Sequence, residues 1–151
     1  MSLEQDIQQK RSFRNDRHKA IVNLIYTHNW VLERLKDVLK EDGITPQQFN
    51  ILRILRGSNG PISTLQIRER MLDKMSDTSR IVDRLITKEL ATKTVSKYDK
   101  RLVDVLISEK GLQTLKNIDE KQERLDQLMG NITYDEAASI NILFDKIRGS
   151  N

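Results

Sequence analysis

The sequence predicts a mainly α-helical protein with one small β-hairpin. Apolar residues recur with a helical period over most of the chain, and the period changes to strict alternation only between residues 90 and 107. Hydrophobic residues make up 37% and charged residues 32% of the 151 residues, which suits a folded protein with an extensive solvated surface. This length allows one small domain with an additional helical module.

The composition disfavours several classes of protein. The absence of cysteine excludes disulfides, thiolate zinc sites and thiol-based redox sensing. His18 and His28 are the only histidines, and no glycine-rich phosphate loop or nucleophile motif is present, so we expect no enzyme activity, metal or cofactor. With no run of about 18 apolar residues and no apolar leader, we expect a cytoplasmic protein without membrane contact.

Positive charge is concentrated away from the C-terminus. Residues 1–107 carry 20 Lys or Arg against 14 Asp or Glu, whereas residues 108–151 carry 6 against 8. A polyanion should therefore bind within residues 1–107 rather than at the C-terminal end. The excess is modest, and a merely solvated basic surface would account for it equally well.

Two capping boxes predict the first helices of the middle region. Thr45 and Gln48 flank Pro46, which suits the first position of a helix, so we expect a helix over about 46–56. Ser63 and Gln66 repeat the box and open a short helix that reaches about residue 71. The two segments are thus adjacent short helices.

A third helix and a hairpin follow. Ser76 is placed to cap a helix that ends near Lys88, with an apolar stripe formed by Ile81, Val82, Leu85 and Ile86. Alternating apolar residues over 103–107 predict a strand, and residues 92–95 favour a preceding one. The polar segment 96–100 then becomes an exposed hairpin tip.

Long amphipathic helices are predicted at both ends of the chain. One begins at about Asp16 or earlier and carries an apolar stripe to Leu39, a second runs from about Glu109 to Met129, and a capping box at Thr133 opens a third. A small middle domain cannot cover all these stripes, so we expect a homodimer. The predicted units are 1–44 and 108–151 for dimerisation, and 45–107 between them.

Helix, turn, helix and hairpin, in that order, predict a winged helix-turn-helix domain that binds DNA. Four features together resemble the MarR family of bacterial regulators: Gln48, the run SDTSRIVDRL over 76–85, DKR over 99–101 and ISEKG over 107–111. The resemblance covers about residues 16–148. It implies a homodimeric transcriptional regulator on a pseudo-palindromic operator, with the second helix of the motif in the major groove and, in many members, release by a small effector.

The helix after Ser76 provides the first candidate DNA contacts. Arg80 suits a base-edge contact, because a guanidinium bridges guanine O6 and N7, although it also has Asp77 and Asp83 within intrahelical reach. Arg84 fits a phosphate contact or a structural ion pair equally well. In the first turn, the hydroxyls of Ser76, Thr78 and Ser79 suit a phosphate; Thr78 stands where the family usually has an aliphatic residue, so it also fits the core.

The hairpin tip provides the others. Lys97, Lys100 and Arg101 suit phosphate or minor-groove contact, and Arg101 matches the wing arginine of the family; the alternative is a merely soluble turn. By the same match, Asp99 braces the tip.

Two residues depart from the family pattern. Asp77 places an anion near the DNA, where the family more commonly has a small neutral residue. The favourable interaction of a carboxylate with the N-terminal end of a helix best explains its presence. Glu89 replaces a usual glycine, and we expect the turn there to take another form than the left-handed one.

Tyr26, His28 and Trp30 on the first long helix are candidates for lining an effector cleft, with dimer packing as the alternative role. The alternative function for the whole protein is a winged-helix dimer that binds proteins or serves a structural role without recognising a DNA sequence.

Overall fold

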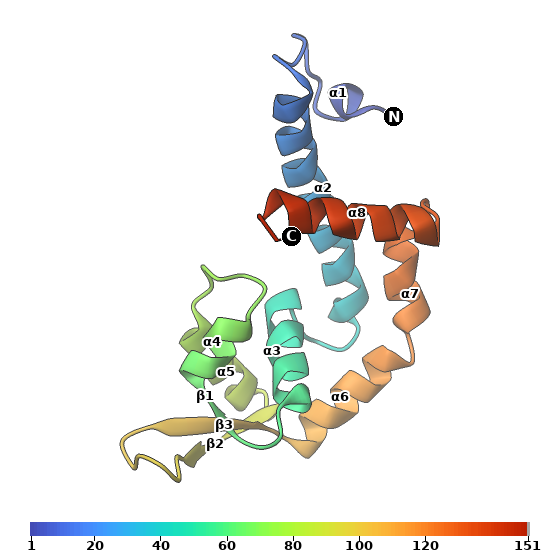
Figure 1. Ribbon diagram of the computed structural model, residues 1–151. Helices are drawn as coiled ribbons and strands as arrows, with labels where there is room; N and C mark the ends of the chain where they lie inside the picture. The colour runs from blue at the N-terminus through green and yellow to red at the C-terminus, as the bar shows by residue number, and fades with distance from the viewer. Residues whose placement is uncertain (151) are drawn as a thin grey trace.

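The computed structural model describes residues 1–150 and has a winged helix-turn-helix domain between long terminal helices (Figure 1). The helices are α1 (Leu3–Asp6), α2 (Asp16–Lys40), α3 (Pro46–Gly57), α4 (Thr64–Arg70), α5 (Thr78–Thr87), α6 (Glu109–Asp119), α7 (Gln122–Asp126), the 3-10 turn η1 (Gln127–Met129) and α8 (Tyr134–Ile147). The strands are β1 (Ile62–Ser63), β2 (Ala91–Val95) and β3 (Val103–Ile107). The predicted mainly helical fold with a small wing is confirmed.

Local capping chemistry places three helix starts as predicted. Thr45, Ser63 and Thr133 each cap their helix through the side chain, and in each case the residue three positions on returns a side-chain hydrogen bond. At α3, the backbone N–H of Gln48 donates to Thr45 Oγ1 at 3.1 Å, and Gln48 Oε1 accepts from the backbone of Thr45 at 3.1 Å. The capping boxes therefore fix where α3, α4 and α8 begin.

The start of α5 differs from the prediction by one residue. Asp77, and not Ser76, is the N-cap: its carboxylate accepts from the backbone N–H of Arg80 at 3.2 Å. The hydroxyl of Ser76 donates instead to the carbonyl of Asp73 at 2.8 Å, in the turn before the helix. An ionised carboxylate is the stronger acceptor at the positive end of a helix, which explains the difference.

The sheet has one strand more than the sequence predicts. Its order is β1-β3-β2, with both pairings antiparallel. The two-residue strand β1 pairs Ile62 with Val105, so the wing hairpin is attached on its β3 side to the segment that leads into α4. Two residues are too few for a detectable alternation of apolar and polar side chains.

Glu89 adopts the left-handed conformation that the sequence led us to expect it would avoid, with a φ of +61°. The N–H of Leu90 donates to the carbonyl of Leu85 at 2.9 Å, and that of Glu89 to Ile86 at 2.9 Å. This is a Schellman motif, which normally carries glycine at that position. The two hydrogen bonds and the burial of Leu90 offset the cost of a side chain there.

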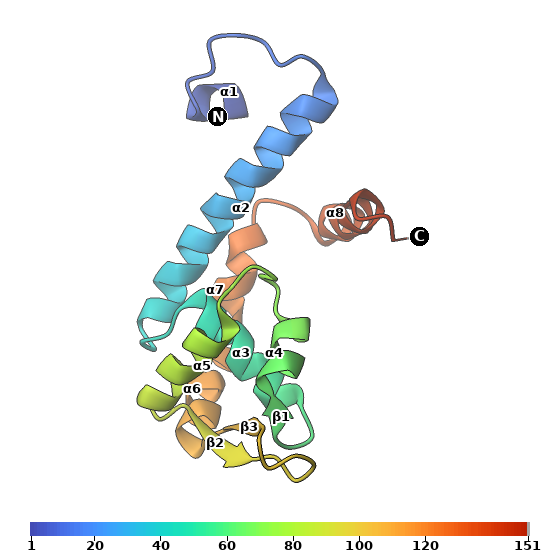
Figure 2. The ribbon, with the colours of Figure 1, turned by 90° about the vertical axis from the view of Figure 1, so that its left-hand side faces the viewer.

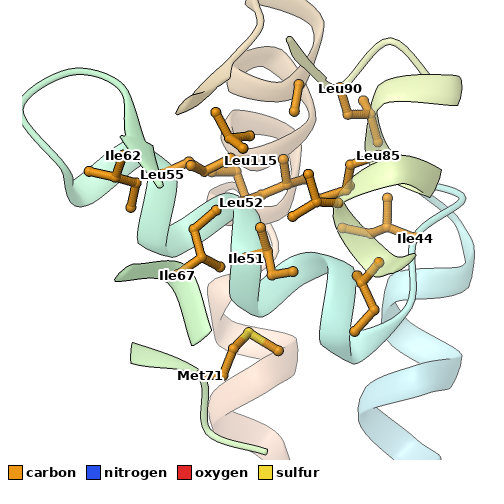
Figure 3. Close-up of a cluster of buried hydrophobic side chains, with 14 of the residues drawn as sticks. Ile44, Ile51, Leu52, Leu55, Ile62, Ile67, Met71, Leu85, Leu90 and Leu115 are labelled. Atoms are coloured by element: carbon orange, nitrogen blue, oxygen red, sulfur yellow. The ribbon is translucent and has the colours of Figure 1, made fainter. Parts of the chain in front are cut away.

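The core lies around α3, which contributes Ile51, Leu52 and Leu55 (Figure 3). Leu85 of α5 and Leu115 of α6 pack against them, and all five side chains are at most 2% exposed. The cluster also takes Leu39 from the end of α2 and Ile118 from α6. Segments outside residues 45–107 thus complete the core of the winged domain.

The predicted helix from Glu109 to Met129 is broken in the structure. It ends at Asp119, and a turn at 120–121 precedes α7 and η1. The apolar period continues across the break, so it carries no signal of the interruption.

The terminal helices bury little of their apolar surface. Along α2 only Val38 and Leu39 are buried, and α8 has no buried residue at all. Figure 2 shows α8 standing apart from the upper part of α2. Within residues 1–150, no helix combines the length and apolar character needed to cross a bilayer.

Candidate nucleic-acid interface

Helix α5 buries one face and exposes the other. Ile81, Val82 and Leu85 are buried against the core, so the helix presents its polar side outward. Arg80 and Arg84 lie on this outer side and are exposed, and their guanidinium groups make no hydrogen bond or ion pair within residues 1–150. The alternative intrahelical pairs of Arg80 are therefore not formed in the structure.

The neighbouring anions on α5 already have partners. Asp77 caps the helix, and Asp83 accepts from Lys93 Nζ of β2 at 2.6 Å. Pairing lowers the repulsion that these carboxylates would exert on a phosphate, and it leaves the two arginines as the outward cations of the helix. The outer face of α5 thus presents positive charge.

The three candidate hydroxyls in or next to the first turn of α5 differ in their exposure to solvent. Ser79 is exposed and Ser76 is half-buried, beside an open groove between α4 and α5 that Arg68 also lines. Thr78 is only 3% exposed, and its hydroxyl has no hydrogen-bond partner in the described residues. The structure thus places Thr78 on the inner face of the helix, which is the core role that its sequence position also fits, and its hydroxyl is not accessible to DNA.

The wing tip is a tight turn held by several hydrogen bonds. The N–H of Ser96 donates to Leu102 at 3.0 Å, and that of Leu102 to Asp99 at 2.9 Å. The Asp99 carboxylate accepts from Nε and Nη2 of Arg101 at 3.1 and 3.0 Å, and from the Arg101 backbone at 3.0 Å. Asp99 thus braces the tip in the structure, and its partner, which the sequence did not indicate, is Arg101.

This brace fixes the charge of the tip as well as its shape. The guanidinium of Arg101 lowers the pKa of Asp99 from its ordinary value, and the carboxylate raises the pKa of Arg101. The Arg101 side chain remains 88% exposed despite the bidentate bond. Lys97 and Lys100 are also exposed, so all three predicted wing cations are accessible to an external anion, although Arg101 is already paired with Asp99.

Sequence reasoning passed over Tyr98, which lies between these cations and is 99% exposed. Its backbone N–H donates to Ser96 Oγ at 3.2 Å, which fixes the turn while leaving the ring in solvent. The sequence did contain a signal for Tyr98 as a candidate nucleic-acid contact: an aromatic ring between lysines in a hairpin tip, because such rings stack on sugars and bases.

The three residues considered as candidates for binding an effector lie on α2, far in sequence from α5 and the wing. Tyr26 and His28 are exposed, and Trp30 is half-buried. The guanidinium of Arg34 covers the Trp30 ring, with its carbon 3.6 Å from the ring centroid, and donates to the Trp30 carbonyl at 3.4 Å. The structure thus gives Trp30 an intrachain partner, while the other two side chains face outward.

Comparison with known families supports the same domain. Residues 42–102, which include α3, α4, α5 and β2, match the sequence profile of the MarR family. This part of the chain is therefore similar in sequence to MarR-family domains. The match contains the helix-turn-helix and most of the wing, so it covers both candidate DNA-contacting elements of this MarR-type domain.

Relatives extend the likeness to the terminal helices. The HTH-type transcriptional repressor MdtR of Bacillus subtilis is 32% identical over 73 residues, which are 48% of this chain and 46% of MdtR. The chain therefore matches less than half the length of that relative. The fold of a mutant E. coli MarR, solved in complex with operator DNA, covers 91% of this chain and 99% of its own, with a TM-score of 0.80 at 21% identity.

An organohalide-sensing transcriptional regulator, solved in its 2,4-dichlorophenol-bound form, has a TM-score of 0.82 at 22% identity, with 93% of this chain and 86% of its own covered. At these identities the two structural matches show the fold. Over more than nine-tenths of its length, including the long terminal helices, the chain therefore has the winged-helix fold of these structures.

Proposed function

We propose that this protein is a transcriptional regulator that binds a pseudo-palindromic DNA site as a homodimer. The observation that carries the proposal is the pair of outward arginines on α5, Arg80 and Arg84, whose guanidinium groups have no partner within residues 1–150. In a helix-turn-helix protein the second helix of the motif enters the major groove, which here is α5. Arg80 then contacts a base edge, and Arg84 a phosphate.

The remaining DNA contacts come from the start of α5 and from the wing. Ser76 and Ser79 lie in or next to the first turn, where backbone amides and hydroxyls bind phosphate. Arg101, held by Asp99, reaches the backbone or minor groove, with Lys97 and Lys100 beside it. MdtR, a repressor by name, and the operator complex of E. coli MarR support DNA binding by analogy.

The proposed dimer follows from the exposed apolar side chains of the terminal helices. Ile21, Leu24 and Ile25 on α2 are 41–59% exposed, and Leu143 and Ile147 on α8 are 56% and 69% exposed. In a dimer formed through these faces, the two α5 helices must lie about 34 Å apart, one helical turn of DNA, to enter successive major grooves. The homodimer thus supplies the two-fold symmetry that a pseudo-palindromic site requires.

An effector that changes this spacing would release DNA, and the dichlorophenol-bound relative supports such regulation by analogy. In this chain Tyr26 and His28 are the exposed aromatic and imidazole groups on the dimerisation helix, with Trp30 beside them. Dimer packing is the competing role for all three.

Selection of bound sequences from random duplex DNA tests the function. A regulator enriches a site with dyad symmetry. Its affinity for that site should fall steeply as the salt concentration rises, because binding releases counterions from the DNA phosphates. Absence of enrichment at low salt contradicts the proposal and favours a winged-helix dimer that binds proteins.

Two substitutions then separate base contact from backbone contact on the selected site. Arg80→Ala should cost about 1–3 kcal/mol and relax the preference at one base position, because it removes a base-edge contact. Arg101→Ala should weaken all sequences nearly alike and reduce the salt slope by about 1, because it removes a phosphate contact. Lys116→Met is the control, since Lys116 is an exposed lysine on α6, which belongs neither to α5 nor to the wing. Equal affinities of the wild-type and Arg101→Ala proteins would refute the wing assignment.

A further inference from the structure

The C-terminal end of α5 is fastened to the turn that joins α2 and α3. Lys88, the residue after α5, donates from Nζ to the carbonyl of Gly43 at 2.7 Å and to Gln48 Oε1 at 2.9 Å. Gln48 is 4% exposed and also accepts from the backbone of Thr45. The ammonium group therefore joins the end of the proposed DNA-recognition helix to both sides of one short turn.

The same turn is fastened to α7 from the other side. Both Glu41 oxygens accept from the Arg124 guanidinium at 3.0 Å, and one also accepts from Lys121 Nζ at 2.9 Å. Lys121 bonds Asp42 as well, at 2.9 Å. Since α2 and α7 belong to the terminal helical module, the turn lies between that module and α5. We call these seven residues the junction: Glu41, Asp42, Gly43, Gln48, Lys88, Lys121 and Arg124.

Stability alone does not account for this arrangement. Glu41 and Arg124 are about half exposed, and ion pairs at such positions contribute little to the free energy of folding. Several directional hydrogen bonds on this five-residue turn do, however, fix the angle between α5 and the terminal helices that they join. The carbonyl of Lys88 also accepts from Lys110 Nζ of α6 at 3.1 Å, so the end of α5 is held from two directions.

We propose that Lys88 is a positioning residue, which sets the angle of α5 relative to the terminal helices and thereby the half-site spacing that the protein accepts. This inference rests on the proposed function for its consequence in DNA binding, but its structural part does not. A ten-residue helix is about 15 Å long, so a tilt of about 10° at Lys88 moves the far end by about 3 Å. That displacement is close to the rise of one base pair.

Two measurements test the proposal. The first is the distance between spin labels at Ser79→Cys and Lys36→Cys, which report on α5 and α2; the absence of native cysteine makes the labelling unique. Labelled chains are refolded with excess unlabelled protein, so that only distances within one chain are recorded. The second is the affinity for duplexes whose selected half-sites are moved apart or together by one base pair.

The variants are Lys88→Met, Lys88→Arg and Glu41→Gln, with Lys116→Met as the control. Lys88→Met should broaden or displace the label distance and reduce the preference for the selected spacing about tenfold. Glu41→Gln, a change at a half-exposed side chain, should act in the same direction from the other side of the turn. Lys88→Arg keeps a cationic donor and should restore the wild-type distance and spacing preference.

A distance distribution for Lys88→Met as narrow and as centred as that of the wild type overturns the proposal. So does a Lys88→Arg protein that behaves like Lys88→Met, because the hydrogen-bonding cation would then be irrelevant. If the wild-type protein binds none of the duplexes, the proposed function fails, and the label distances still decide the role of Lys88.

Discussion

The winged domain and the terminal helices use apolar residues at similar helical spacing, but only the first covers them within one chain. In α3, Ile51 and Leu52 are fully buried, whereas Ile142 and Ile147 of α8 are 68% and 69% exposed. The difference shows that a periodic apolar stripe predicts a helix with a buried face and leaves open which surface buries it. Here the winged domain, together with the end of α2 and with α6, covers its core within one chain, whereas α8 and the rest of α2 leave apolar side chains exposed.

The largest expected effect compares the same substitution in both regions. Leu52→Ala removes a fully buried side chain and should lower the free energy of unfolding by about 2–5 kcal/mol at any protein concentration. Leu143→Ala should lower stability only at concentrations where the dimer forms, because its side chain is half exposed in the single chain. Denaturant unfolding at several protein concentrations distinguishes them; a concentration-independent loss for Leu143→Ala would remove the contrast.

A second comparison tests how tightly α6 closes the winged domain. A Cβ at Gly111 would collide with the carbonyl oxygen of Leu90 and lie 2.8 Å from Ile107 Cγ1. Gly111→Ala should therefore destabilise the protein by about 1–3 kcal/mol, although alanine normally favours a helix. Gly57→Ala, where nothing lies within 4 Å, is the control and should be neutral or slightly stabilising in thermal unfolding. A harmless Gly111→Ala would show that this contact relaxes.

A smaller effect is expected at the joint between α5 and the wing. Glu89→Gly should stabilise the protein by about 1 kcal/mol, because glycine adopts a φ of +61° without the clash of a Cβ. Glu89→Ala keeps the Cβ and removes only the 84%-exposed carboxylate, so it should bring no gain. Chemical denaturation of the three proteins measures both values, and equal stabilities of the glycine and alanine variants would contradict the explanation.

The smallest effect concerns the contact between the two regions. Hydrogen bonds from Arg124 and Lys121 lower the pKa of Glu41 from 4.5 to about 2. A lowered folded-state pKa means that the contribution of Glu41 to stability is complete above pH 4.5 and is lost as the pH falls toward 2. The stability difference between wild type and Glu41→Gln should follow that course in unfolding experiments over pH 2–7. A constant difference across this range would exclude the ionised carboxylate as its cause.

Local chemistry made much of the fold predictable from the sequence. Capping boxes at Thr45, Ser63 and Thr133 involve residues three apart, so no tertiary information is needed to place them. The third strand and the break at residues 120–121 depend on distant packing, which a local period does not report. At Ser76 and Asp77 two capping residues compete, and only the folded turn decides between them.

The candidate site was predictable to a similar degree. The exposure of Arg80, Arg84 and Arg101 follows from their place opposite an apolar stripe or in a polar tip. Thr78 illustrates the limit, because a threonine at the start of a helix suits either a phosphate contact or a place in the core, and only the folded structure shows that its side chain is buried. The junction brings together residues up to 83 positions apart, and a sequence pattern carries no signal for such contacts.

The wing has a consequence for proteolysis. Its central strand β3 is held by neighbours on both edges, whereas its tip exposes Lys97, Lys100 and Arg101 on a solvated turn. Trypsin cleaves after such residues, and exposed tips are its preferred substrates in folded proteins. A cut after Lys100 leaves both strands hydrogen-bonded in the sheet and separates Arg101 from Asp99, the residue that braces it. Limited digestion should therefore yield a nicked, folded protein, and bound DNA should protect the tip from the enzyme.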